Sequence, residues 1–472
     1  MDIKRLTPLA GIAILFVLGI YLWFISIGPW RERGFTSDYY ARLATSFRNG
    51  QLFLEEKPDP ALLALPNPYD HKARKDVPVV GDASLYKGKY YLYFGPFPGA
   101  ILALLPFRPG DPVFVYLFII GLFGIQTLLL ISISRRFFPE ASVWIIGLGI
   151  LTLGLTGPFL KMLSHPFIHE AAIAGGQFLF AAGLYFAFTA LKDLPVRPAR
   201  LVLASLFWSF SIATRTTQLV PVGFMVLLTW LYLFVEERKA GKPPQLWKPA
   251  LALAAPLAAC GVILAWYNWA RFESIFEFGL YYQLAAFNLQ ANYDILFSRV
   301  YLIQNFYNYF LNPFELTGSF PFAYPLPGAE QPVLPFVELP NLYAVEGRFA
   351  GALLSTPVLL FSIIPILYLG TTFIERIKKG SKTDVFFNWT LTALLGSALA
   401  GAIPTLLLFY VGFRYETEFI ASLTLLAVLG FSQSYLFLKD SNSRRSLAII
   451  LTGLVGFSVW VNISLAYTSL RG

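Results

Sequence analysis

Long runs of apolar residues, separated by short polar segments, extend along the chain of 472 residues. The first run, residues 9–27, carries no charge. At about 1.5 Å rise per residue, a helix of this length crosses a hydrocarbon core of about 30 Å. The same rule marks ten further stretches, of which residues 201–214 are short enough to tilt little or to form a hairpin with their neighbour. The pattern predicts about eleven membrane spans, at residues 9–27, 113–134, 141–160, 171–191, 201–214, 219–235, 250–270, 350–373, 385–413, 419–438 and 447–467.

Composition agrees with this pattern and defines the class of protein. Hydrophobic residues make up 56% of the chain and charged residues only 13%, and the mean hydropathy is +0.61. Soluble domains carry about 25% charged residues. We therefore predict an all-α polytopic membrane protein that forms a single integral membrane domain over residues 1–472. Lys4 and Arg5 precede the first run and no small-residue cleavage site follows it, so we interpret it as a retained anchor.

The distribution of charge predicts the orientation of the spans, because Lys and Arg accumulate on cytoplasmic loops. With the N-terminus inside, the inside segments carry 18 of the 36 basic residues but only 8 of the 27 acidic ones. The net charge of +9 then follows from topology, and no nucleic-acid partner is needed to explain it. We expect a protein of the cytoplasmic membrane with its functional site on the outer side.

This orientation leaves two large regions outside, residues 29–112 and residues 271–349. Loops of this size usually have structure and a function of their own. The single cysteine, Cys260, lies within a predicted span, so no internal disulfide braces these loops. We expect the functional residues in these two regions.

The first outer region opens with an amphipathic pattern. Thr36, Ser37 and Asp38 are typical of a helix start, apolar residues follow at helical spacing, and Asn49-Gly50 ends the pattern. An Asp in this position is often a helix cap. A carboxylate just outside a bilayer is also well placed to act on a lipid-borne substrate, so both interpretations of Asp38 stand.

Further along, residues 82–94 predict a β-hairpin around Lys87-Gly88. In the second outer region, aromatic and amide residues gather between positions 281 and 312. Such residues suit sugar rings, and they equally suit the membrane interface. The Pro-rich residues 321–340 predict an extended strap over the site.

Several segments, taken in order, resemble the GT-C superfamily of membrane glycosyltransferases. The resemblance is to the group that includes protein mannosyltransferases and aminoarabinose transferases, and one segment resembles bacterial members. One departure is that many members have a second acid beside the loop Asp, where this chain has Tyr39. The matching segments are Asp38-Tyr39-Tyr40 after the first span, the helix end Phe210 to Arg215, the bacterial-type segment Tyr267 to Gly279, and Phe413-Arg414-Tyr415 with Glu418.

The resemblance implies an inverting transfer of a hexose or pentose from a polyprenyl-phosphate donor to a hydroxyl of a glycan, lipid or protein acceptor. Asp38 would be the general base, and a bacterial source is expected. Such chemistry also needs cations that stabilise the departing phosphate. The candidates at the outer ends of spans are Arg215, Arg414, Arg348 and Lys161, for each of which an interfacial anchor or a salt bridge is the alternative.

Candidates for a second acid are Asp82, Glu170 and Glu277. Two of the three histidines, His165 and His169, lie close to Glu170. These three residues are types that bind a divalent metal, a phosphate or an acceptor, or that simply form hydrogen bonds at the interface. Pro166 interrupts a regular helical turn between the histidines, so we assign no metal site and no certain cofactor.

Two other classes of protein share the general pattern of many spans. A secondary transporter is disfavoured, because the chain shows no repeated halves and few charges in the middle of its spans. A non-catalytic subunit of a membrane complex that keeps a glycosyltransferase-like fold is the alternative, and the absence of an acid beside Asp38 would fit it.

Overall fold

The computed structural model describes residues 3–27, 37–193, 195–239, 246–326, 333–347, 349–379 and 384–470. Within these ranges, nine helices are long and apolar enough to cross a membrane. Two shorter apolar helices accompany them, α6 (Val143–Leu155) and α9 (Pro198–Thr214). The chain is therefore an integral membrane protein. The long helices are α1 (Ile3–Ile27), α5 (Asp111–Phe137), α8 (Ile168–Leu191), α10 (Leu219–Lys239), α11 (Trp247–Phe272), α14 (Ile363–Lys379), α15 (Val385–Leu407), α16 (Thr417–Phe437) and α17 (Ser441–Thr468).

Each of the eleven predicted stretches overlaps one of these helices, but two of the helices end clearly earlier than hydropathy predicts. Residues 141–160 do not form a single span, because α6 stops at Leu155 and a separate short helix, α7 (Phe159–Ser164), follows. Gly157 has a positive φ of 81°, a conformation that a helix cannot contain, and Pro158 follows it. The stretch 385–413 also ends early, since α15 stops at Leu407 and is followed by strand β6 (Tyr410–Val411).

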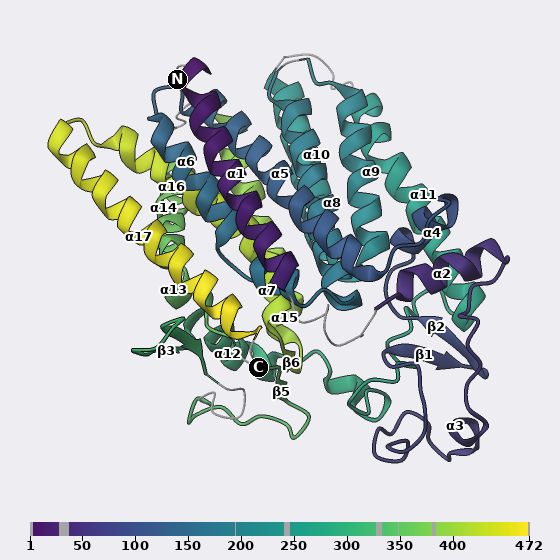
Figure 1. Cartoon of the computed structure of the whole chain (residues 1–472). Coiled ribbons are helices and arrows are strands. Elements are labelled where there is room, and N and C mark those ends of the chain that lie inside the picture. Colours follow the sequence, from purple (N-terminus) through teal and green to yellow (C-terminus); the bar gives the residue numbers. More distant parts are fainter. Residues whose placement is uncertain are drawn as a thin grey trace.

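The centre of the bundle is formed by α8, which packs against α5 on one side and α9 on the other (Figure 1). A Cβ at Gly183 in α8 would come within 2.4 Å of the Trp208 ring of α9. Trp208 is fully buried. Small residues allow membrane helices to approach closely. The absence of a side chain at Gly183 therefore sets the spacing of α8 and α9.

A glycine also allows close contact between α15 and α16. A Cβ at Gly401 would lie 2.0 Å from the backbone oxygen of Glu418. The two helices are therefore in backbone contact beside Glu418.

Elements of the two large loop regions lie together at one end of the bundle, which we call the loop face, while α1 begins at the opposite end (Figure 1). In the first region, the amphipathic segment forms α2 (Tyr39–Arg48), with Tyr40, Leu43 and Ala44 on its buried side. The region also contains α3 (Pro60–Ala64), α4 (Phe97–Leu104), and the antiparallel strands β1 (Ala83–Tyr86) and β2 (Lys89–Leu92).

The second loop region joins the first through backbone hydrogen bonds. Leu85 N donates to Tyr282 O at 2.9 Å, and Leu284 N donates to Ala83 O at 2.9 Å. Residues 282–284 thus continue the hairpin on the free edge of β1. This pairing fixes Asp82, which lies just before β1, against the second loop region.

The remainder of the second region contains two small sheets and short helices. Strands β3 (Phe314–Leu316) and β4 (Ala323–Pro325) are antiparallel, whereas β5 (Ala344–Val345) pairs in parallel with β6. Two short helices flank them, α12 (Leu302–Phe306) and α13 (Ala352–Ser355). Part of the predicted Pro-rich strap, residues 327–332, lies outside the described residues.

Candidate active site

A cavity of about 680 Å³ opens where the two loop regions meet the ends of the helices. One part of its wall is charged and comes mainly from the ends of helices and from Asp82. The other part is apolar and comes from the second loop region and the end of α15. The charged part contains Arg74, Asp82, Lys161, Glu170, Arg215, Glu346 and Arg414, with His165 and His169, and the apolar part includes Leu280, Leu284, Phe287, Leu289, Leu296, Phe297, Leu408 and Phe409.

Arg215 is placed by the end of α9, one residue after Thr214. Its Nε donates to Oε1 of Glu418 in α16. Glu418 also accepts hydrogen bonds from Thr217 Oγ1 at 3.1 Å and from Gln177 Nε2 at 3.1 Å. The carboxylate is therefore buried and well satisfied, and it fixes the guanidinium at the cavity wall.

Arg414 connects the bundle to the second loop region. Its Nη1 lies 2.6 Å from Glu346 Oε1, just after β5, and 3.7 Å from Glu170 Oε1 in α8. The buried Nε atom of Arg414 has no hydrogen-bond partner among the described residues. This cation thus retains a donor that its two carboxylate neighbours do not use.

Lys161, on α7, is the third cation at the charged end. Its Nζ lies 4.0 Å from the centre of the Phe413 ring. Burial lowers the pKa of Lys161 to about 8, against the opposing effect of the carboxylates of Glu346 and Glu170. The ammonium form therefore dominates at neutral pH, and it loses its proton only slightly above this range.

An acid and an imidazole face these cations. Asp82 has a positive φ of 56°, which Asp tolerates better than most residues. Its Oδ1 accepts from Gln283 Nε2 at 3.1 Å, and its Oδ2 lies 3.5 Å from His169 Nε2. Burial raises the pKa of Asp82, while Arg414 and Gln283 act in the opposite direction. The pair is suited to accepting or orienting a proton inside the cavity.

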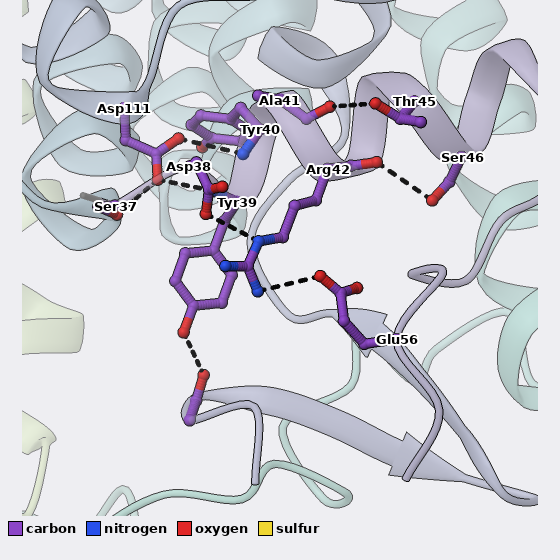
Figure 2. A network of polar contacts seen from close by, with 11 residues as sticks. Ser37, Asp38, Tyr39, Tyr40, Ala41, Arg42, Thr45, Ser46, Glu56 and Asp111 are labelled. Atoms are coloured by element: carbon purple, nitrogen blue, oxygen red, sulfur yellow. Dashed lines mark hydrogen bonds and ion pairs between the residues drawn. The ribbon is translucent and has the colours of Figure 1, made fainter. Parts of the chain in front are cut away.

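Asp38 does not line this cavity. Its carboxylate pairs with Arg42 Nε at 2.7 Å, and Arg42 Nη1 lies 3.1 Å from Glu56 (Figure 2). The link to the cavity is the next residue, Tyr39, whose hydroxyl donates to the backbone oxygen of Gly81 at 2.8 Å. Gly81 is part of the cavity wall.

The cap interpretation of Asp38 does not describe this geometry. Asp38 occupies the N-cap position of α2, yet its side chain makes no capping hydrogen bond. The first amides of α2 instead donate to Asp111, the first residue of α5 (Figure 2). The Asp38 side chain is 38% exposed, although its Oδ1 atom, which pairs with Arg42, is buried.

The remaining candidates differ in their placement. Glu170 accepts from the Phe167 amide at 3.3 Å at the start of its own helix, and His165 lies beside Ser164 at the cavity wall. Glu277 does not line the cavity and accepts from the amides of Gly279 and Tyr281. Arg348 lies outside the described residues. The structure brings together Asp82, Lys161, His165, His169, Glu170, Arg215 and Arg414.

The acids Asp111, Glu418 and Glu346 of these networks were not among the sequence candidates. Asp111 stands between Gly110 and Pro112, which is a helix-start signal, and Glu418 follows the Arg414-Tyr415 segment closely. Glu346 carries no local signal. In the part of the chain that the structure describes, no group of three or more His, Cys, Asp or Glu residues is placed to hold a metal ion.

Comparison with known proteins adds evidence on the fold. No family model and no curated protein matches the sequence. The fold is similar to the crystal structure of the oligosaccharyltransferase of Archaeoglobus fulgidus in the apo form, with a TM-score of 0.50 and 15% sequence identity. A second structure, the archaeal oligosaccharyltransferase AglB from the same organism in complex with an inhibitory peptide and a dolichol-phosphate, has a TM-score of 0.48 at 15% identity and covers 96% of this chain and 56% of that one.

The first match covers 99% of this chain but only 56% of the other protein. The chain thus spans little more than half the length of the oligosaccharyltransferase. At this level of identity, the similarity concerns the fold alone. The resemblance to GT-C membrane glycosyltransferases is therefore confirmed as a likeness of fold, which extends over nearly the whole chain.

Proposed function

We propose that this protein is a membrane glycosyltransferase. It transfers a sugar from a polyprenyl-phosphate donor to an acceptor hydroxyl at the loop face, which the charge distribution assigns to the outer side of the membrane. The observation that carries this proposal is the convergence of Lys161, Arg215 and Arg414 on one cavity that also holds the Asp82 and His169 pair. A phosphate leaving group needs such cations, and the acid and imidazole beside them are able to bind and orient an acceptor hydroxyl.

In the proposed reaction, the three cations hold the donor phosphate. The bond between the anomeric carbon and the phosphate oxygen breaks, and the polyprenyl phosphate leaves with the bonding electrons. Arg215, Arg414 and Lys161 stabilise the negative charge that develops on this leaving group.

A carboxylate takes the proton of the acceptor hydroxyl. The hydroxyl oxygen forms the new bond to the anomeric carbon, on the side opposite to the departing phosphate. We assign this role of general base to Asp38, whose side chain is 38% exposed and is not used as a cap. Asp82, held by Gln283 and close to His169, is the proposed second acid. A displacement of this kind inverts the anomeric centre.

Arg215 and Arg414 are already paired with carboxylates in the structure, and these pairs affect how a donor would bind. Arg414 contacts Glu346 at 2.6 Å, and the Glu346 side chain is 30% exposed. Glu418, which holds Arg215, is 2% exposed. A donor phosphate therefore competes with Glu346 for Arg414, whereas the pair of Arg215 and Glu418 stays intact.

The test is transfer of a radiolabelled sugar from a set of polyprenyl-phosphate donors by the purified protein in nanodiscs. We expect transfer by the wild type and a loss of about 100-fold or more for Asp38→Asn, with an unchanged melting temperature. Asp59→Asn is the matched control, because Asp59 caps α3 in the same loop region and lies outside the cavity wall. Full activity of Asp38→Asn would remove Asp38 from the mechanism. Donor binding without transfer by the wild type would favour the non-catalytic subunit.

A further inference from the structure

The start of α2 is held by a residue from another part of the chain. A helix leaves its first amides without partners inside the helix, and an acid at the N-cap normally accepts them. Here the amides of Tyr39 and Tyr40 donate to Asp111, at 2.9 Å to Oδ2 and 3.0 Å to Oδ1. Asp111 is fully buried. One carboxylate at the start of a membrane span thus replaces the local cap.

Two further contacts join the same segments. Ser37 Oγ donates to Asp111 Oδ2 at 2.5 Å, and the Asp111 amide donates to Ser37 O at 2.8 Å. Gly110 approaches so closely that a Cβ there would lie 2.9 Å from Ser37 O. The residues on both sides of Asp38 are therefore fixed to the start of α5, as Figure 2 shows.

The side chain of Asp38 is the exception in this segment. It makes no bond to the amides of α2 and pairs instead with Arg42 (Figure 2). Ser37 is 7% exposed and Tyr40 is fully buried, whereas the Asp38 side chain is 38% exposed. Because Asp111 satisfies the helix start, the Asp38 carboxylate is not needed there.

We propose that Asp111 is a positioning residue for Asp38: it caps α2 from the neighbouring span, so that the Asp38 carboxylate is not needed as a cap and Asp38 is held between two residues that are fixed to the start of α5. This inference rests on the proposed function, since it assumes that Asp38 is the general base. It adds a residue that does not itself touch the substrate.

The first test measures the helix start without using activity. Hydrogen–deuterium exchange of peptides from residues 37–48 is compared between the wild type and Asp111→Asn in nanodiscs. Asparagine keeps the size of the side chain but offers one acceptor oxygen instead of two. We expect faster exchange of the Tyr39 and Tyr40 amides. In the control Asp59→Asn, exchange should quicken only around α3. Unchanged exchange in Asp111→Asn would overturn the inference.

The second test asks whether Asp111 acts through Asp38. We expect Asp111→Asn to lower kcat about tenfold with little change in donor KM. It should have no further effect on the residual activity of Asp38→Asn, because residues that act as a unit are not additive. If Asp111→Asn folds poorly, Ser37→Ala is measured in its place. It removes a single donor to the same carboxylate, so we expect a smaller loss of kcat.

The outcomes separate the two proposals. An equal loss for Asp111→Asn in the wild-type and Asp38→Asn backgrounds would overturn the positioning role and leave the glycosyltransferase function standing. Absence of transfer by the wild type with every donor would overturn the proposed function, and the catalytic part of this inference with it.

Discussion

Two polar networks lie side by side at the loop face, and they are built differently. In the cavity, Arg215 pairs with Glu418 and Arg414 with Glu346, and these partners come from elements far apart in the chain. Beside α2, Asp38 pairs with Arg42 four residues away, and both side chains are about a third exposed. Buried pairs are costly to break, whereas exposed pairs contribute little. The first network therefore contributes to the stability of the architecture, whereas the second contributes little to it.

The largest effect is expected from breaking the pair of Arg215 and Glu418. Arg215→Met leaves a buried carboxylate without its cation, which costs about 3–5 kcal/mol. The measurement is thermal unfolding in detergent. In the double variant Arg215→Met with Glu418→Gln, the charge is removed from both sides, so we expect much of the lost stability to return. Equal melting temperatures of the single variant and the wild type would show that the pair is not structural.

The next effect concerns the donor at Arg414. Arg414→Ala removes a charge-assisted contact to the phosphate, so we expect donor KM to rise about tenfold or more. Glu346→Gln should have the opposite effect on donor KM. It removes the group that competes for Arg414, so donor KM should fall several-fold. Both values come from steady-state kinetics at saturating acceptor. A rise in KM for Glu346→Gln would argue against the competition.

A smaller effect is expected from pH. Burial lowers the pKa of Lys161 to about 8, so its ammonium group is present below this pH and lost above it. We expect donor KM to rise as the pH increases through this value, and Lys161→Arg to remove this rise, since arginine keeps its charge. The profile of KM against pH between about 6.5 and 9.5 is the measurement. An identical profile for both proteins would assign the effect to another group.

The smallest effect is expected at Arg42. Its pair with Asp38 is exposed, so Arg42→Gln should change the stability by less than about 1 kcal/mol. Thermal unfolding and kcat are compared with those of the wild type. A loss of stability as large as that of Arg215→Met would remove the contrast between the two networks.

The membrane architecture was predictable from sequence because each span is recorded in local hydropathy. The error in the predicted span 141–160 also has a local cause. Gly157 and Pro158 end α6 within an apolar run that hydropathy alone treats as continuous. Seven candidate residues meet at the cavity, since charges at the ends of spans are conspicuous in an apolar chain.

What could not be predicted depends on contacts between distant residues. Asp111 and Tyr39 are 72 positions apart, and Arg414 and Glu346 are 68 apart. No periodicity in the sequence links such pairs. For the same reason, whether Asp38 caps α2 could be decided only from the position of Asp111.

The pairing of residues 282–284 with β1 makes the position of the second loop region independent of many of its side chains. These bonds join backbone atoms, so they hold the second loop region in place whatever side chains it carries. The apolar wall formed by Leu284, Phe287 and Leu289 can therefore change in size and shape while Asp82 keeps its place. Under the proposed function, substitutions in this wall would alter which molecules fit the cavity, while its charged residues stay in place.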